Sequence, residues 1–395
     1  MTTTTTPPPP PPPPPPISTT TTSTSTSPTA EKGISRHEFT KYDKTISYLD
    51  AGPADGPLLV FVHGWPAIAA TWTAQLRGFS VLGFRVVAPD MPGYGASGPK
   101  RQEKGEYALE KVVAQMLQLL RHVGRSEAVW IGHGWGAGVV WALLAHNPEV
   151  CLGVVAMAVP YRTLEMGVPE LLKYANRDLY PEAEYPHAQW SHHTFYQDPD
   201  NYAKAIDFFD THVEGFLRFV YARRPDADVE QDRDKPALTA NVAKNGGWFT
   251  DGDGAESLPK TEDLGESLVD EETHKALVEA FTSGGFWAPT AYNLNDDANL
   301  QWCEDWSVNE GVVSVPVLFV EALNDAVVGT HNSTICDPMK SYCRRLTTVS
   351  IGAGHWVALE APQETNAAIL RWIARELPEE RAWPWGKKNP LKKNE

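Results

Sequence analysis

One short stretch, residues 128–137, combines an apolar run, a tight turn among small residues and the start of a helix. This sequence is typical of enzymes that hold an attacking side chain on a strained turn, with a small residue two positions before it and another two positions after it. Gly132 and Gly136 occupy the small positions, and Gly134 stands between them, where the nucleophile is expected. Because glycine has no side chain, a covalent intermediate at residue 134 is excluded.

Two further residues could handle protons. Asp325 follows the apolar run 315–322, and His355 follows the run 346–351. The order turn, acid, base along the chain is the order that this chemistry uses when its groups lie on one parallel sheet. Asp325 would hold the His355 imidazole in the correct tautomer and stabilise its charged form, while His355 would take a proton from water. Glu321 is a weaker candidate for the acid.

Backbone donors for a developing negative charge are expected at two places. The apolar run 57–62 ends in the sequence His-Gly-Trp-Pro, and the loop after such a strand supplies one N–H group. We expect that group to be the N–H of Trp65. The second would come from Trp135, directly after the turn residue Gly134. Together they predict an oxyanion hole.

The elements that must position these residues alternate between strands and helices. Residues 107–123 place apolar side chains on one face of a helix. The expected strands are 45–48, 57–62, 85–90, 128–132, 152–160, 315–322 and 346–351. Alternation of this kind indicates an α/β protein with a mostly parallel, doubly wound sheet, and the turn at Gly134 indicates the α/β-hydrolase fold.

The alternation stops between residues 161 and 308, where aromatic and histidine residues are frequent. We expect this part to be a helical cap inserted into a hydrolase core made of residues 35–160 and 309–380. Within the cap, residues 226–272 carry 14 acidic and 4 basic side chains, which predicts a solvated acidic loop with short helices. Its Asp-Gly-Asp-Gly run lacks the terminal glutamate of a calcium loop, so a plain acidic loop is expected.

Both ends of the chain differ from the rest in composition. Residues 1–34 are rich in Thr, Pro and Ser, have almost nothing apolar to bury, and predict a disordered tail whose polyproline segment could dock an SH3-like groove. Residues 381–395 predict a basic C-terminal tail. The net charge of −16 argues against nucleic acid and anionic membranes as partners. No apolar run approaches the roughly 20 residues of a membrane span.

The four cysteines show no metal-binding spacing. They predict reduced thiols in a cytoplasmic protein, although Cys336 and Cys343 are close enough in sequence to leave a disulfide open. No metal or organic cofactor is expected, and the sequence says nothing of the oligomeric state.

Several stretches together resemble one family, the α/β-hydrolase epoxide hydrolases. The resemblance runs from residue 35 to about 380. It rests on HGWP (63–66), DMPGYGAS (90–97), GHGWG (132–136), PVLFV with a following ND (316–325) and GHWVALEAP (354–362). In that family the turn reads GHDWG, and its Asp attacks an epoxide carbon to form an ester that water, activated by the His–Asp pair, then hydrolyses. Gly134 departs from this pattern.

The resemblance also implies proton donors in the cap, where the family uses two tyrosines. The segment 286–292 resembles the one that carries the second donor, which points to Tyr292. The segment 190–199 resembles the one that carries the first, with His192 at the expected position. Imidazole can also donate a proton, so His192 is the expected donor there, and Tyr196 is interpreted as a packing aromatic.

Three functions are compatible with these residues. The first is an epoxide hydrolase-like enzyme for a hydrophobic small molecule, with His355 and Asp325 as the base pair and Tyr292 as proton donor, in which Gly134 has silenced or altered the usual reaction. The second is a cyclase or isomerase on the same scaffold. The third is a catalytically silent binding protein. Retention of Asp325, His355 and Tyr292 favours an enzyme with altered chemistry over a binder, because a pure binder has no need of a base and an acid.

Overall fold

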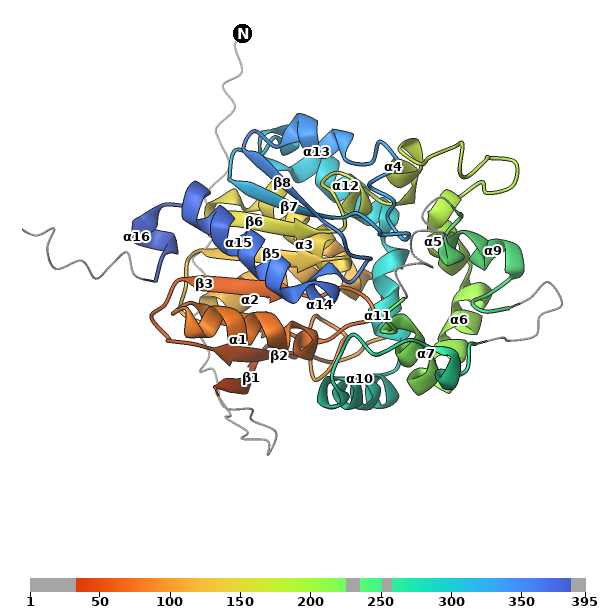
Figure 1. The fold of residues 1–395 in the computed structure, drawn as a ribbon, viewed down its shortest axis with the longest axis horizontal. Coiled ribbons are helices and arrows are strands. Elements are labelled where there is room, and N and C mark those ends of the chain that lie inside the picture. Colours follow the sequence, from red (N-terminus) through yellow and green to blue (C-terminus); the bar gives the residue numbers. More distant parts are fainter. Residues whose placement is uncertain (1–32, 225–234, 251–257, 385–395) are drawn as a thin grey trace, which may run out of the picture.

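The computed structural model describes residues 33–224, 235–250 and 258–384. A twisted sheet of eight strands forms its centre, with helices on both faces (Figure 1). The strands lie in the order β1-β2-β4-β3-β5-β6-β7-β8; β1 and β2 are antiparallel to their neighbours, and the remaining pairs are parallel. They are β1 (Ile34–Lys41), β2 (Lys44–Ala51), β3 (Leu58–Val62), β4 (Arg85–Pro89), β5 (Ala128–His133), β6 (Cys151–Met157), β7 (Val317–Ala322) and β8 (Leu346–Ile351).

The central strands are apolar along their whole length because helices cover both faces of the sheet. In β3, Leu59 and Phe61 contribute to the apolar layer under α1 and α15, whereas Val60 and Val62 contribute to the layer under α2 and α3. The core helices are α1 (Thr73–Val81), α2 (Leu109–His122), α3 (Trp135–His146), α13 (Asp337–Tyr342), α14 (Val357–Glu360), α15 (Pro362–Glu376) and α16 (Glu379–Ala382). The predicted α/β-hydrolase fold is therefore confirmed.

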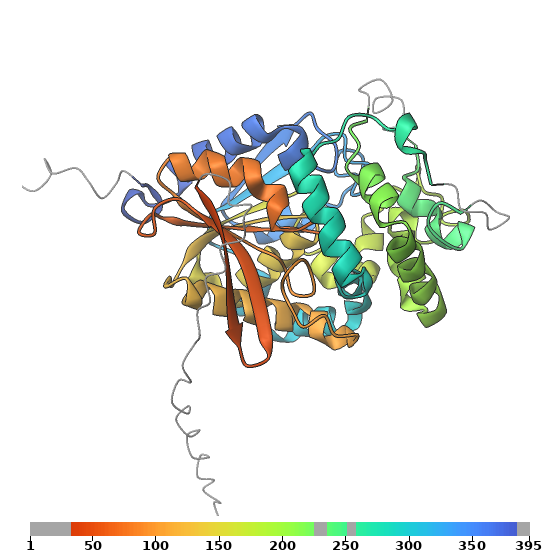
Figure 2. The same cartoon turned by 90° about the horizontal axis from the view of Figure 1, so that it is seen from below.

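A helical layer lies beyond the carboxyl ends of the parallel strands, on the right in Figure 1. Figure 2, turned by 90°, shows the same layer beside the ends of the strands. Its helices are α4 (Val168–Lys173), α5 (Ser191–Gln197), α6 (Pro199–Thr211), α7 (Val213–Val220), α9 (Val242–Asn245), α10 (Glu271–Gly284) and α11 (Trp287–Thr290). They lie within the range 161–308 that the sequence assigns to the cap. The next helix, α12 (Asp296–Trp306), packs against α2 and α3 of the core.

Some expectations differ from the structure in detail. β1 was not foreseen, because this edge strand buries few apolar side chains, chiefly Ile34 and Phe39. β6 ends at residue 157 rather than 160. α16 crosses the expected boundary between core and C-terminal tail at residue 380. Most of the two predicted tails and parts of the acidic loop, including residues 251–254, fall outside the described residues.

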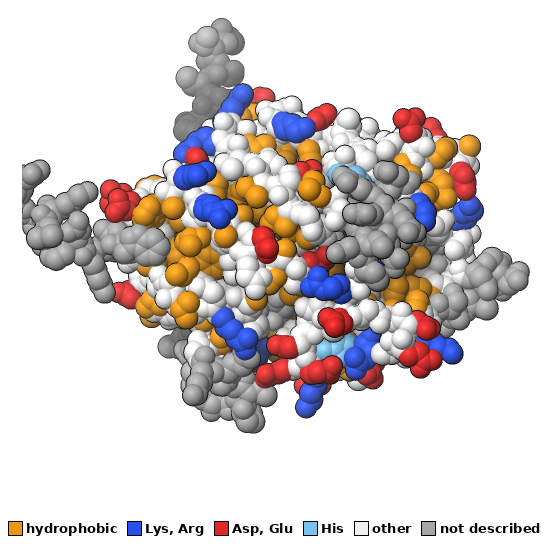
Figure 3. All heavy atoms as spheres, viewed as in Figure 1, with side chains coloured by type: hydrophobic (Ala, Val, Ile, Leu, Met, Phe, Trp, Pro, Cys, Tyr) orange, Lys and Arg blue, Asp and Glu red, His pale blue; other side chains and the backbone are white. Residues whose placement is uncertain are grey.

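The surface and the thiols add three observations. Acidic side chains gather over α10 in Figure 3, where Glu271, Glu272 and Glu279 are exposed. Cys336 and Cys343, like the other two cysteines, are buried and unpaired. Among the described residues, no helix has the length and apolar character needed to cross a bilayer, and no group of three His, Cys, Asp or Glu residues could hold a metal ion.

Candidate active site

The turn between β5 and α3 has its sharpest point at Gly134, with φ +57° and ψ −123°. Strand and helix approach closely around it. A Cβ on Gly132 would lie 2.2 Å from the carbonyl oxygen of Gly136, and a Cβ on Gly136 would lie 2.0 Å from that of Val62. Both distances are far below van der Waals contact, so these two flanking positions require glycine.

Gly134 itself has room for a side chain. An ideal Cβ at this position would meet Gly64 Cα at 3.8 Å and His355 Nε2 at 3.9 Å, with no described atom closer. Both are ordinary contact distances. The restriction at residue 134 is therefore its positive φ, which costs a non-glycine residue about 1–3 kcal/mol. Space does not forbid a carboxylate there, directed toward the imidazole.

His355 and Asp325 are brought together by the loops that follow β8 and β7. His355 Nδ1 lies 2.9 Å from Asp325 Oδ2. Asp325 is fully buried, and its other oxygen accepts hydrogen bonds from the backbone N–H groups of Val327 at 2.8 Å and Val328 at 3.1 Å. Glu321, the weaker candidate, instead accepts a hydrogen bond from Ser350 Oγ on β8. The acid that orients the imidazole is Asp325.

Asp325 and His355 also shift each other's pKa. Burial lowers the pKa of His355, but the charge and hydrogen bond of Asp325, helped by Glu360, outweigh it and leave the pKa above its usual 6.5. Burial raises the pKa of Asp325, while His355 and the two backbone donors lower it, with a net decrease. Since Asp325 accepts the Nδ1 proton, the free Nε2 faces Gly134 as the basic atom.

The loop that carries His355 is held from two sides. Glu360 accepts hydrogen bonds from the N–H groups of Gly354 at 2.7 Å and Trp356 at 3.0 Å. On the other side, the ring Nε2 of His133 lies 2.7 Å from the carbonyl oxygen of His355. Burial lowers the pKa of His133 to about 3, so this ring is neutral and donates to the carbonyl. These bonds fix the imidazole relative to the turn.

Trp65 and Trp135 lie where the sequence expects the oxyanion hole. Trp135 is the first residue of α3, so its N–H has no partner within the helix. The loop after β3 comes so close to the turn that a Cβ on Gly64 would lie 2.7 Å from the carbonyl oxygen of His133 and 2.9 Å from the Trp135 nitrogen. Gly64 thus places the Trp65 backbone beside that of Trp135.

A cavity of about 890 Å³ lies between the core and the cap. From the core it is lined by Gly134, Trp135, Trp65 and His355, and from the cap by α5, α7 and the segment around Trp248. Apolar side chains, aromatic and aliphatic, make up most of its wall, and Arg223, Arg224, Lys235 and Asp263 also line it. The aromatic ones are Trp65, Trp135, Trp190, Tyr196, Phe216, Phe219, Trp248, Phe249 and Trp356. An enclosure of this size and character suits an apolar small molecule.

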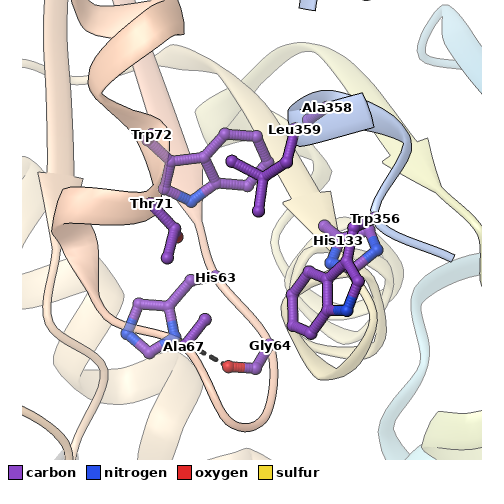
Figure 4. Close-up of a pocket in the computed structure, with 9 residues that line it drawn as sticks. All are labelled: His63, Gly64, Ala67, Thr71, Trp72, His133, Trp356, Ala358 and Leu359. Carbon is purple, nitrogen blue, oxygen red and sulfur yellow. Dashed lines mark hydrogen bonds between the residues drawn. The ribbon is translucent and has the colours of Figure 1, made fainter. Parts of the chain in front are cut away.

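A much smaller cavity, of about 10 Å³, lies behind the turn (Figure 4). It is enclosed by His63, Gly64, Trp72, His133 and Trp356, among others. In this view His63 bonds to the carbonyl oxygen of Gly64, with Nδ1 and O 2.9 Å apart. The volume admits about one water-sized sphere. Of these two cavities, only the large one has room for a small organic molecule.

Tyr292 does not take the place that the sequence assigns to it. Its ring is 1% exposed, its hydroxyl donates to the Pro92 carbonyl oxygen at 3.0 Å, and it is absent from the described residues that line the cavity. Asn293, the next residue, lines the cavity instead, with its Oδ1 accepting from Trp135 Nε1 at 2.9 Å. Because its hydroxyl is committed to Pro92, this geometry does not support the predicted role of Tyr292 as proton donor.

His192 lies at the cavity as expected, on α5. Burial and the neighbouring His193 lower the pKa of His192 well below 6.5, so its ring is neutral. Tyr196, one helical turn further, also lines the cavity. Its hydroxyl oxygen accepts a hydrogen bond from Trp248 Nε1 at 2.7 Å. Tyr196 is thus packed in the cap as the sequence suggested, with a hydrogen bond to Trp248 in addition.

The sequence reasoning missed Glu360, Asn293 and Trp248. Glu360 lies five residues after His355, within the stretch GHWVALEAP, and a carboxylate that close to a strained loop is a signal for backbone capping. Asn293 differs from the expected residue by one position. Trp248 gave no signal, since its partner Tyr196 lies 52 positions away in the chain.

Comparison with known proteins agrees with this geometry. Residues 57–362 match the family described as alpha/beta hydrolase fold. Epoxide hydrolase A of Mycobacterium tuberculosis is 29% identical over 345 residues, which cover 83% of this chain and 94% of that protein. Bifunctional epoxide hydrolase 2 of Sus scrofa is also 29% identical, over 322 residues, or 80% of this chain and 51% of that protein. The chain therefore spans about half the length of this mammalian relative.

Solved structures give the same result. Epoxide hydrolase A from Mycobacterium thermoresistibile superposes with a TM-score of 0.66 at 25% identity, covering 87% of this chain and all of that one. The epoxide hydrolase VrEH1 from Vigna radiata, at 22% identity and a TM-score of 0.68, supports the fold. The chain therefore belongs to the alpha/beta hydrolase fold family, and within it the chain is similar to the epoxide hydrolases named above.

Proposed function

We propose that this protein hydrolyses an epoxide on a hydrophobic small molecule by direct attack of water, without an ester intermediate. The single observation that carries the proposal is the His355–Asp325 pair facing Gly134. Burying a carboxylate costs free energy, which the hydrogen bond to the imidazole offsets. An imidazole held in this way by an acid is the arrangement of a general base.

The reaction begins with a water between His355 Nε2 and the bound epoxide. The water gives one proton to Nε2, while Asp325 stabilises the imidazolium that forms. Its oxygen attacks an epoxide carbon from the face opposite the C–O bond of that carbon, and this C–O bond breaks. The resulting alkoxide takes the proton back from the His355 imidazolium through solvent, which gives the diol and restores the base. No bond to residue 134 is formed at any stage.

The glycine leaves the space between the oxyanion-hole donors and the base available to the water. One of the N–H groups of Trp65 and Trp135 can then hold that water through one lone pair of its oxygen, which leaves the other lone pair free to attack the epoxide carbon. In a relative with an aspartate at the turn, a carboxylate oxygen would occupy the same region. The proposal therefore assigns to water the position that the family gives to its nucleophile.

The substrate class follows from the cavity and from the relatives. About 890 Å³ lined by Trp65, Trp248, Phe216 and similar rings favours a bulky, flat, apolar molecule. The relatives named above are epoxide hydrolases, and an epoxide is reactive enough to be opened by a base-activated water. A substrate with its own hydroxyl group near the epoxide could replace water and cyclise.

Product analysis tests the proposal. The protein is incubated with trans-stilbene oxide, a bulky aromatic epoxide, and with styrene oxide, a small one, and the diols are quantified beside His355→Gln. The proposal expects diol from the unaltered protein, more from the bulky probe, and a loss of diol in the variant. Equal diol from both proteins, or an isomer in place of diol, would reject it.

A further inference from the structure

Two tryptophans of the candidate active site are bonded through their indole N–H groups to one short segment of the cap, residues 287–294. Trp65 Nε1 donates to Thr290 Oγ1 at 3.1 Å, and Trp135 Nε1 donates to Asn293 Oδ1 at 2.9 Å. Asn293 Nδ2 also donates to the Thr290 carbonyl oxygen at 2.9 Å. The two acceptors are therefore held relative to each other. We call residues 287–294 the anchor segment.

The anchor segment is itself bonded to the core. The hydroxyl of Tyr94 donates to the Pro289 carbonyl oxygen at 3.0 Å, and the hydroxyl of Tyr292 donates to the Pro92 carbonyl oxygen at 3.0 Å. The two tyrosine rings meet edge to face, with centroids 5.6 Å apart. In Figure 1, α11 lies between the ends of the strands and α7. The anchor segment is thus fixed to the loop that follows β4.

The backbone N–H groups of Trp65 and Trp135 have little restraint from the residues that precede them. The N–H of Trp65 belongs to the peptide unit shared with Gly64, and that of Trp135 to the unit shared with Gly134. Glycine has the widest backbone freedom of any residue. Neither N–H makes a hydrogen bond within the described part of the chain. A bonded indole restrains each tryptophan from its side-chain end instead.

We propose that Thr290 and Asn293 are positioning residues, which hold Trp65 and Trp135 so that their backbone N–H groups point at the reacting oxygen. The assignment rests on the proposed function, which gives these N–H groups their task. Donors that are fixed in advance cost no reorganisation when charge develops, and removing one of them costs about 10²–10³ in kcat. A donor that is misdirected but still present should cost less, about 10-fold.

The test compares Asn293→Leu with Asn295→Leu. Asn295 is a matched control: it is 5% exposed, against 4% for Asn293, and donates to the carbonyl oxygens of Lys104 and Ala291, so that neither bond involves a tryptophan. With trans-stilbene oxide, Asn293→Leu should lower kcat about 10-fold with KM within about threefold, whereas Asn295→Leu should keep kcat within about twofold. Thr290→Val should also lower kcat, and Thr290→Ser, which keeps the hydroxyl, should restore it.

A second measurement does not depend on direct attack by water. In the Gly134→Asp background the carboxylate can form an ester with the epoxide. Ester formation removes charge from the carboxylate, whereas ester hydrolysis places a negative charge on the carbonyl oxygen, so a misdirected N–H should slow only hydrolysis. When Asn293→Leu is added to Gly134→Asp, intact-protein mass spectrometry should show the ester accumulating. Adding Asn295→Leu should not have this effect.

The outcomes separate this assignment from the proposed hydrolysis. An equal fall in kcat in Asn293→Leu and Asn295→Leu at similar melting temperatures would show a general effect of the cap and overturn the assignment. An unchanged rate of ester hydrolysis when Asn293→Leu is added to Gly134→Asp would overturn it as well. Absence of diol from the unaltered protein, with the ester accumulating as expected in the double variant, rejects only the proposed attack by water.

Discussion

His355 Nε2 lies 3.9 Å from the point where a Cβ of residue 134 would stand, so base and turn face each other although the turn carries no side chain. The flanking glycines are fixed by backbone contacts of 2.0 to 2.2 Å, whereas nothing described crowds residue 134 itself. The absence of a nucleophile at the turn is thus a matter of one side chain.

Introducing an aspartate at residue 134 should restore a covalent mechanism. We expect Gly134→Asp to raise epoxide turnover by about 100-fold or more, since its carboxylate would point at His355. In Gly134→Asp combined with His355→Gln, the ester should accumulate, and intact-protein mass spectrometry should show an increase equal to the substrate mass. The positive φ should lower stability by about 1–3 kcal/mol.

Gly134→Asn is the matched control, because it has the shape and the backbone strain of aspartate without the nucleophilic carboxylate. It should lose the same stability and gain no turnover. If both variants gained turnover equally, the gain would have to come from filling space near the base, and the covalent interpretation of Gly134→Asp would be rejected.

Asp325 should affect turnover through the tautomer of His355 that it stabilises. In Asp325→Asn, the amide oxygen can still accept from Val327 and Val328, and its NH₂ group then faces His355 Nδ1 as a donor. Nδ1 becomes the acceptor and the proton moves to Nε2, which removes the base. We expect turnover to fall by about 10³–10⁴-fold with little change in melting temperature. Steady-state kinetics beside thermal unfolding measures both.

The pH dependence of turnover should report the raised pKa of His355. A general base works only when neutral, so activity falls as the pH drops below its pKa. Because Asp325 and Glu360 hold that pKa above 6.5, the acidic limb of kcat/KM should lie above pH 6.5. Glu360→Gln removes one negative charge and should move the limb to lower pH. A limb below pH 6 in the unaltered protein would contradict this assignment.

Two neighbouring residues, Tyr292 and Asn293, show how much of the site could be predicted from the sequence. The core strands and the order Gly134, Asp325, His355 follow from hydrophobic runs and from what comes after each run, which are local signals. Tyr292 and Asn293 lie together on a short 3-10 helix, Ala291–Leu294, where a shift of one residue changes which side chain faces the cavity. Segment resemblance alone could not resolve that shift.

Tyr196 illustrates a different obstacle. Its hydroxyl accepts a hydrogen bond from Trp248, which reaches it from a segment beyond α6 and α7. No periodicity in the sequence links two residues joined only by the folding of the cap. A tyrosine beside an aromatic-rich helix is therefore interpreted as packing until its hydroxyl and its partner can be placed.

Buried histidines should make the protein sensitive to acid. Burial lowers the pKa of His193 to about 3 in the folded protein. Between about pH 6.5 and pH 3, His193 therefore stays neutral in the folded state and is protonated in the unfolded chain. Its contribution to stability is therefore lost as the pH falls from about 6.5 toward 3, at about 1.4 kcal/mol per pH unit. Glu165, whose pKa burial raises to about 7, acts in the opposite direction, which makes the total slope a poor measure.

Comparing the pH dependence of stability in the unaltered protein and in His193→Phe isolates the contribution of this histidine. His193→Phe preserves a ring against Trp135, 6.2 Å away between centroids, and cannot be protonated. Chemical denaturation at pH 7.0 and pH 5.5 should show the unaltered protein losing stability relative to His193→Phe. An equal pH dependence in both proteins would show that residue 193 titrates normally in the folded state.

The source of the oxygen that enters the product tests the central claim most directly. In a single turnover of trans-stilbene oxide in H₂¹⁸O, with enzyme in excess, direct attack by water predicts one ¹⁸O atom in the diol from the unaltered protein. Gly134→Asp should instead deliver unlabelled oxygen from its own carboxylate in that first turnover. Unlabelled diol from the unaltered protein would reveal an attacking enzyme group and contradict the account, as would a product that forms without taking up any oxygen.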